Sequence, residues 1–312
     1  MKYFNSFLFV ALATFSVFAQ KRELTLSESV LQQYRAFKPE QLNGLMWIPK
    51  SDTYVYFSDN YQTMYSVSAG AKTTVAKQWF TIQEINTALG SELFNFFGCS
   101  WKNETELFLN NGQQFYVFNT STKKGKLLSD VGDKAENAVF HEGAGHIAFT
   151  VNNNLFVKNA NGEKLIVTSN EDRSIVSGQS IARNEFGING GILWSPKGNI
   201  LAFYQKDESE VANYPLVDIT QTPASLMDIK YPMAGQKSEK PKVGIYSLTT
   251  KQTIYISPRG AADDYFTNLS WSPDEKFILV AEVNRDQNHM WLNCFDASTG
   301  AFVKTLFEEK ND

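Results

Sequence analysis

Residues 194–203 and 271–280 read WSPKGNILAF and WSPDEKFILV, and these two stretches decide the fold. In each stretch an aromatic residue ends one strand, a turn follows, and an apolar strand begins. Proline fixes φ, and Gly or Asn tolerates positive φ, so the residues between the two strands suit a tight turn. The same pattern of aromatic residue, turn and apolar strand recurs in three further stretches, which start at Trp47, Trp101 and Phe140.

Each of these five repeats continues into a second hairpin. The strands that open the second hairpins are Met64–Val67, Phe115–Phe118, Leu155–Val157, Val243–Tyr246 and Trp291–Phe295. Four short antiparallel strands cannot bury both faces alone, but radial stacking of such units does so. The sequence therefore predicts an all-β fold, a β-propeller of four-stranded antiparallel blades with five repeats. A β-sandwich is the alternative, but it does not account for the repeated Trp-Ser-Pro turn.

An insertion interrupts the fourth repeat at about residues 204–242, and insertions in repeat arrays usually project from one face. The content of 24 Phe and 13 Tyr also favours strands.

The charge, the cysteines, the histidines and the motifs argue against a nucleic-acid partner, a disulfide, a metal site and a catalytic serine in this chain. The net charge is −4 without a basic block, so no nucleic-acid partner is expected. Cys99 and Cys294 each lie in an apolar run and are expected to be free thiols rather than a disulfide. The three histidines stand in no metal-ligand pattern, so neither a metal site nor a cofactor is expected. No G-x-S-x-G motif is present, and we assign no catalytic residue.

The amino terminus has the pattern of a secretory signal. Lys2 precedes an apolar stretch over residues 7–18. Val17 and Ala19 supply small residues at the −3 and −1 positions of a cleavage site, and polar Gln20 follows. We expect a signal peptide over residues 1–19, a mature chain over residues 20–312, and export to the periplasm or the medium. A membrane anchor or a buried helix is the alternative, although the apolar run is short for a membrane span.

An ordered set of motifs carries a family resemblance that covers essentially the whole mature chain. The motifs are ARNEFGI (182–188), LWSPKGNILAFY (193–204), DESEV (207–211), YPLV (214–217), IKYPMAG (229–235) and NRDQNH (284–289). Together they resemble the N-terminal propeller of the dipeptidyl peptidase IV family of prolyl oligopeptidase-type serine peptidases, and in particular its bacterial prolyl di- and tripeptidyl peptidases.

The resemblance implies a propeller followed by an α/β-hydrolase domain that carries Ser, Asp and His. Family propellers have eight blades, so five repeats would form an incomplete arc cut from a larger peptidase. The implied partners are proline-containing oligopeptides and the hydrolase domain, and homodimers are common in the family.

The resemblance also implies a substrate-binding role for Glu185. Family members hold the free ammonium of the peptide with acidic propeller side chains, and the dipeptidyl pattern uses two adjacent glutamates. Glu185 stands alone between Asn184 and Phe186, as in the tripeptidyl members. We expect Asn184 to add a weaker polar contact. The alternative for Glu185 is a surface pair with Arg183, and for Arg285 we expect a structural ion pair with Asp286.

Two functions remain open on the sequence. The chain is either the substrate-gating, non-catalytic part of a secreted prolyl di- or tripeptidyl aminopeptidase, or a stand-alone periplasmic binding or scaffold propeller.

Overall fold

The computed structural model describes residues 22–72 and 75–311 and divides the chain into two compact units, the first ending at Asn43 and the second beginning at Gly44. The expected signal peptide over residues 1–19 lies outside the described residues. The first unit contains α2 (Leu26–Leu31), which begins with a capping box: Thr25 and Glu28 each bond the other's backbone N–H.

None of the helices in the described residues is long and apolar enough to cross a membrane.

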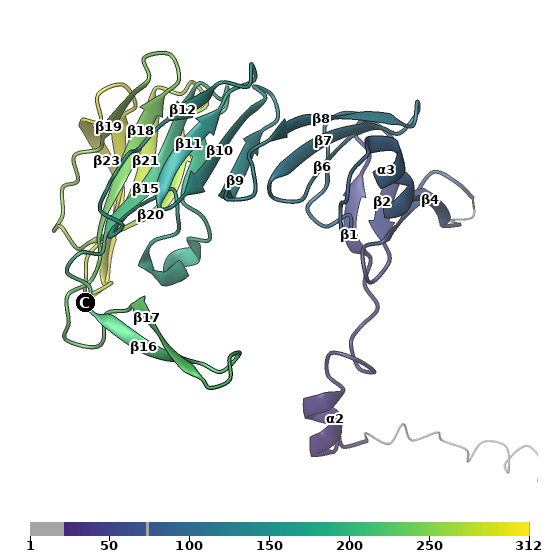
Figure 1. Ribbon diagram of the computed structural model, residues 1–312, viewed down its shortest axis with the longest axis horizontal. Coiled ribbons are helices and arrows are strands. Elements are labelled where there is room, and N and C mark those ends of the chain that lie inside the picture. Colours follow the sequence, from purple (N-terminus) through teal and green to yellow (C-terminus); the bar gives the residue numbers. More distant parts are fainter. Residues whose placement is uncertain (1–21, 73–74, 312) are drawn as a thin grey trace, which may run out of the picture. The chain divides into compact units, whose positions relative to one another are not determined.

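Five antiparallel sheets, which we number blades 1 to 5, follow one another along the chain (Figure 1). Blade 1 comprises β1 (Asn43–Trp47), β2 (Thr53–Phe57), β3 (Thr63–Ser68) and β4 (Lys77–Thr81). Blade 2 comprises β5 (Ser100–Trp101), β6 (Glu106–Asn110), β7 (Gln114–Asn119) and β8 (Lys124–Asp130). Between these blades lies α3 (Ile82–Leu89).

The remaining blades have the same antiparallel pairing. Blade 3 comprises β9 (Glu136–His141), β10 (His146–Val151), β11 (Asn154–Lys158) and β12 (Lys164–Ile166). Blade 4 comprises β13 (Ile175–Ser177), β14 (Ile192–Trp194), β15 (Ile200–Asp207), β18 (Lys240–Ser247) and β19 (Gln252–Tyr255). Blade 5 comprises β20 (Tyr265–Trp271), β21 (Phe277–Val283), β22 (His289–Asp296) and β23 (Phe302–Lys310). The expected all-β propeller of four-stranded blades is confirmed.

Blade 4 departs from four strands because β13 and β14 both pair with β15. The expected insertion is a separate two-stranded hairpin, β16 (Asn213–Asp218) and β17 (Ser225–Lys230). It is shorter than the sequence predicts, because β15 continues to Asp207 and β18 starts at Lys240.

Buried side chains join each blade to the next, since alternate residues of a strand point to opposite faces. In β15, Leu201 and Phe203 pack against blade 3, whereas Ala202 and Tyr204 pack against blade 5. Two further clusters join blades 1 and 2 and blades 2 and 3. The strands are therefore buried on both faces, as stacked blades require.

In blades 3 to 5, the aromatic residue near the end of the first strand reaches back to the preceding blade. Phe140 stacks on Phe108 with ring centroids 4.7 Å apart. The Trp194 indole donates a hydrogen bond of 2.9 Å to the Val139 carbonyl, and the Trp271 indole donates one of 3.3 Å to that of Leu193. These three repeats thus contact the preceding blade through the aromatic residue that marks each of them in the sequence.

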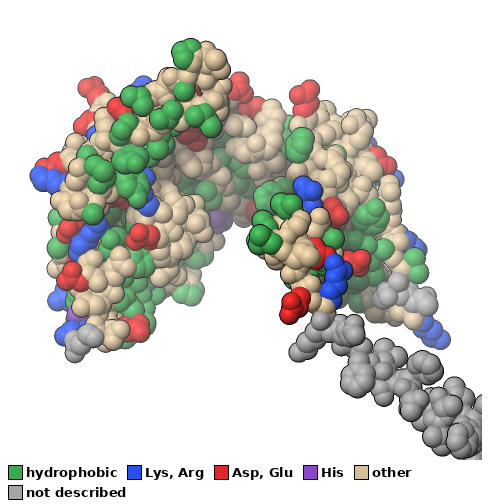
Figure 2. All heavy atoms as spheres, turned by 90° about the horizontal axis from the view of Figure 1, so that it is seen from below, with side chains coloured by type: hydrophobic (Ala, Val, Ile, Leu, Met, Phe, Trp, Pro, Cys, Tyr) green, Lys and Arg blue, Asp and Glu red, His purple; other side chains and the backbone are tan. Residues whose placement is uncertain are grey.

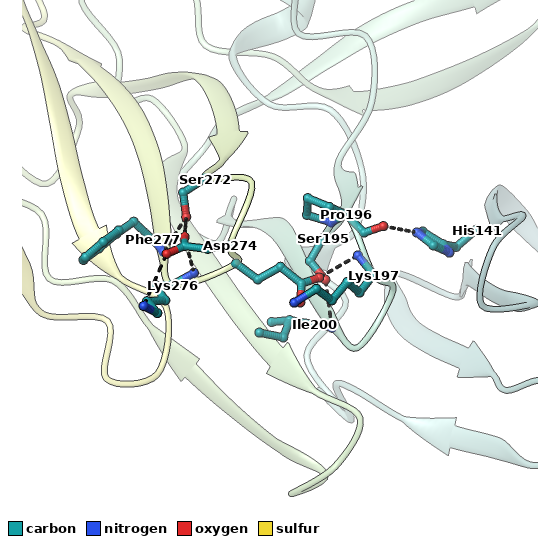
Figure 3. Close-up of polar contacts among 10 residues, drawn as sticks. His141, Ser195, Pro196, Lys197, Ile200, Ser272, Asp274, Lys276 and Phe277 are labelled. Carbon is teal, nitrogen blue, oxygen red and sulfur yellow. Dashed lines mark hydrogen bonds and ion pairs between the residues drawn. The ribbon is translucent and has the colours of Figure 1, made fainter.

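A second set of links joins the turns that follow these aromatic residues (Figure 3). The His141 Nε2 of blade 3 lies 3.2 Å from the Pro196 carbonyl oxygen of blade 4. The Lys197 backbone N–H then donates to Glu275 Oε1 of blade 5 at 2.6 Å. Burial acts to raise the pKa of Glu275, but hydrogen bonds from Ser195 and Lys197 outweigh it and hold that pKa below its ordinary value.

Both cysteines are free thiols, as the sequence predicts. Cys294 is buried, and burial of Cys99 raises the pKa of its thiol to about 12.

Replacement of Trp194 by Phe tests the indole contact between blades. W194F keeps an aromatic ring but leaves the Val139 carbonyl without its donor, so we expect a loss of about 1 kcal/mol in the free energy of unfolding. Urea unfolding followed by circular dichroism measures it. W47F is the matched control, because Trp47 is 56% exposed and its indole donates to no described residue. Equal losses in the two variants would contradict a specific role for the Trp194 indole.

Candidate functional site

The innermost strand of blade 4 is split, and the chain leaves it between β13 and β14. Ser177 pairs with Gln205 and Ile192 pairs with Phe203, so the whole excursion leaves from one position of β15, opposite Tyr204. Tyr204 fastens both ends: its carbonyl accepts from the Gly178 N–H at 2.7 Å, and its own N–H donates to the Gly191 carbonyl at 2.9 Å. We call residues 178–191 the inner-strand loop.

The two ends of the inner-strand loop lie against each other at Gly191. A Cβ at this position would stand 2.2 Å from the Gln179 carbonyl oxygen and 2.3 Å from its nitrogen. Such distances are far inside van der Waals contact, so only glycine allows the two backbones to approach this closely.

The loop carries a strained turn, η1 (Ala182–Gly187). Arg183, Asn184 and Phe186 have φ of 51°, 64° and 55°, and Ala182 has 50°. Left-handed backbone costs a residue with a side chain about 1 kcal/mol or more, so the surrounding contacts must hold the turn in place. Glu185 alone is extended within it, with φ −60° and ψ 162°.

Contacts from distant parts of the chain hold the turn. Glu239 Oε1 accepts from the Ala182 N–H at 2.6 Å, and its Oε2 lies 3.3 Å from Lys206 Nζ. The Arg183 guanidinium donates to the Lys230 carbonyl at the end of β17 and lies 4.4 Å over the Tyr231 ring. The base of the inserted hairpin is therefore part of the frame that fixes η1.

The Glu185 side chain lines a cavity of about 200 Å³ beside the turn. The other lining residues are Ala182, Arg183, Val211, Tyr231, Pro232, Ser238, Glu239, Tyr265 and Arg285. Glu185 is exposed, and no hydrogen bond or ion pair joins its carboxylate to another described residue. The alternative pairing with Arg183 is wrong, because that guanidinium is bound to Lys230 and Tyr231.

Asn184 lies on the same turn but takes part in a different contact. Its Oδ1 is 3.4 Å from Ser180 Oγ, and the cavity beside Glu185 is lined by other residues. The substrate contact expected of Asn184 stays a prediction.

The expected ion pair between Arg285 and Asp286 is wrong. The Arg285 guanidinium lies 4.8 Å over the Tyr265 ring instead, and Phe186 packs against the same ring with centroids 5.0 Å apart. Arg285 thereby becomes a wall of the cavity that Glu185 lines.

Sequence reasoning assigned no role to Glu239, Lys206 or Tyr265, although all three belong to the site. Glu239 is 57 residues from its partner Ala182, and nothing in the local pattern marks it. The one usable signal was that Lys206 lies near the start of the expected insertion, at about residues 204–242.

The chemistry of the cavity suits binding of a cationic, hydrogen-bonding group more than covalent catalysis. Glu185 offers an uncommitted carboxylate, and such a group binds an ammonium through charge-assisted hydrogen bonds. Within the described part of the chain, no group of three or more His, Cys, Asp and Glu side chains could hold a metal ion. Acidic and basic side chains are interspersed over the face seen in Figure 2.

Substitution of Gly191 by Ala tests whether the close approach at the loop's base sets the turn. The added Cβ must push Gln179 aside, so we expect a loss of about 1–3 kcal/mol in the free energy of unfolding and faster amide exchange over residues 178–191. G190A is the matched control, since a Cβ at Gly190 meets nothing within 4 Å. Unchanged exchange in G191A would show that the loop keeps its shape without this contact.

Comparison with known proteins places this fold in a family. Residues 101–312 match the model of the dipeptidyl peptidase IV (DPP IV) N-terminal region. A Bacteroides ovatus protein assigned as a dipeptidyl aminopeptidase IV is 39% identical; the match covers 87% of this chain and 38% of that one, with a TM-score of 0.72. Dipeptidyl peptidase 4 of Porphyromonas gingivalis shares the fold at 19% identity and a TM-score of 0.73, over 93% of this chain and 43% of that one.

A curated relative gives the same family. Dipeptidyl aminopeptidase B of Saccharomyces cerevisiae is 24% identical over 186 residues, which cover 56% of this chain and 22% of that protein. The chain spans about a quarter of the length of the curated relatives that it matches. Because the family model covers more than half of the sequence, the chain belongs to the dipeptidyl peptidase IV N-terminal region family.

Proposed function

We propose that this chain is the substrate-gating and N-terminus-binding propeller portion of an exported prolyl di- or tripeptidyl aminopeptidase. The observation that carries the proposal is the carboxylate of Glu185. It is exposed beside a cavity, it has no partner among the described residues, and it stands on a strained turn that distant contacts hold in place. Backbone strain that the surroundings maintain is typical of binding sites.

The physical basis is that a fixed ammonium defines the register of a peptide. If Glu185 holds the amino-terminal charge, the bond that reaches the nucleophile of the hydrolase domain is counted from that end. A single glutamate favours release of tripeptides over strict release of dipeptides. Asn184, on the same turn, would contribute a neutral polar contact to the peptide.

The proposal includes partners and location. Proline-containing oligopeptides would be the substrates, and an α/β-hydrolase domain would supply the Ser, Asp and His, so that the five blades act as an arc of a larger propeller. Export by the segment at residues 1–19 would place the protein in the periplasm or the medium, and a homodimer is a further expected assembly.

Binding of peptides with free and blocked amino termini tests the role of Glu185. We expect fluorescently labelled Ala-Ala-Pro peptides to bind the protein, N-acetylated versions to bind at least about ten-fold more weakly, and Glu185→Gln to remove this preference. A hydrogen bond to a charged group contributes about 1.5–3 kcal/mol, which corresponds to that factor or more. Fluorescence polarisation gives the dissociation constants.

Glu171→Gln is the matched control, because Glu171 is another exposed glutamate without a contact to a described residue. Equal binding of free and acetylated peptides by the unmodified protein would overturn the assignment of Glu185. The catalytic part of the proposal is tested separately, by release of chromogenic amine from Gly-Pro and Ala-Ala-Pro substrates with and without a hydrolase domain joined to the chain. If neither form cleaves, the stand-alone binding propeller replaces the peptidase.

A further inference from the structure

A second carboxylate, that of Glu282, faces a separate cavity in blade 5. Glu282 lies on β21 with 1% of its surface exposed, on the face that also carries Ile278 and Val280. The cavity measures about 190 Å³ and is lined by Arg259, Gly260, Glu282, Trp291 and Asn293. It shares no lining residue with the cavity beside Glu185.

Only half of the hydrogen-bonding capacity of this carboxylate is used. Glu282 Oε2 accepts from the backbone N–H groups of Arg259 at 3.2 Å and Gly260 at 3.4 Å. Glu282 Oε1 is fully buried and has no hydrogen-bond partner among the described residues. A buried carboxylate oxygen without a partner is costly, so this atom points to a group that the site is built to receive.

Two buried carboxylates lie near this cavity, and no ion pair within the described part of the chain neutralises either of them. A second buried carboxylate, Asp264, is 5% exposed and accepts from the Ala261 N–H at 2.9 Å. Gly260 separates the two acids, and a Cβ there would lie 1.9 Å from Asp264 Oδ2. Neither acid forms an ion pair with any described residue.

Arg259 is the cation at this cavity, and its guanidinium is occupied elsewhere. It lies 4.4 Å over the Phe302 ring and donates through Nη1 to Thr305 Oγ1 at 3.3 Å. Thr305 Oγ1 in turn donates to Asn293 Oδ1 at 2.7 Å. This chain of contacts keeps the guanidinium beyond ion-pair distance of Glu282.

The walls of the cavity suit an organic cation. Trp291 is the direct cross-strand partner of Glu282, so both side chains lie on the same face of the blade, and an indole face attracts cations. Asn293 Oδ1 keeps a second lone pair that can accept a hydrogen bond. Glu282 and Asn293 supply too few oxygens for Ca²⁺, which takes six to eight oxygen ligands.

We propose that the cavity lined by Glu282, Trp291 and Asn293 binds a small primary ammonium ion. One N–H of the ammonium donates to Glu282 Oε1, a second donates to Asn293 Oδ1, and the positive charge lies against the Trp291 ring. The binding is reversible and involves no covalent step. The proposal does not depend on the role of Glu185, because no residue is common to the two cavities.

Thermal unfolding with methylammonium chloride as the probe tests the site. We expect the melting temperature to rise with methylammonium concentration above the value in potassium chloride of equal ionic strength, because a ligand that binds only the folded state stabilises it. In Glu282→Gln the apparent dissociation constant for methylammonium is expected to increase at least about ten-fold. Tetramethylammonium, which has no N–H donor, should give a much smaller rise.

Three results would overturn the proposal. The first is an equal effect of potassium and methylammonium, which would mean a general salt effect or an alkali-cation site. The second is unchanged methylammonium binding in Glu282→Gln. The matched control is Glu309→Gln on the outer strand β23, because Glu309 is exposed, pairs with Met290 rather than with Trp291, and has no side-chain contact to a described residue. The third is binding in Arg259→Gln but none in the unmodified protein, which would mean that Arg259 occupies the site in solution.

Quenching or enhancement of Trp291 fluorescence gives a second readout that does not require Glu282→Gln to fold. Difference spectra between the unmodified protein and Trp291→Phe isolate the emission of this indole. We expect its emission to change along the same binding curve as the melting temperature. An emission that stays constant while the melting temperature rises would place the ammonium elsewhere.

Discussion

The contact between the aromatic residue at the end of a first strand and the blade before it is the interaction on which the structure depends. A four-stranded sheet of this size cannot bury both faces alone, so each blade is stable only against a neighbour. Trp194 and Trp271 add a directional hydrogen bond to that burial, since each indole donates to a backbone carbonyl of the preceding blade. The hydrogen bond fixes the position of one blade on the next, which burial alone does not.

This rigid frame makes the strained turn near Glu185 possible. Four residues with side chains adopt positive φ between Ala182 and Phe186, and such a turn would relax if its ends were free. The ends are fastened to one residue of β15, Tyr204, whose side chain is itself buried between blades 4 and 5. The packed interface between blades 4 and 5 thus holds the turn in place and fixes the position of the exposed Glu185 carboxylate.

The repeats were predictable from the sequence because they rest on local rules. Period-2 burial and a turn that follows an aromatic residue mark the hairpins, and in two repeats this turn begins with Trp-Ser-Pro. The inner-strand loop was not predictable, because Ala182, Arg183 and Phe186 adopt a left-handed backbone that their residue types disfavour. Tertiary contacts from Glu239 and Lys230 impose it, and these partners lie 57 and 47 residues away.

The error over Arg285 has the same origin. Adjacent residues of opposite charge suggest an ion pair, yet a guanidinium is weakly hydrated and stacks well on an aromatic ring. The fold brings Tyr265 within 4.8 Å of Arg285, and a ring on the neighbouring strand is a better partner than an exposed carboxylate next in sequence. Side-chain partners in this blade are therefore set by strand register, which also places Trp291 beside Glu282. The register thus places Glu282 on the same face of the blade as an indole.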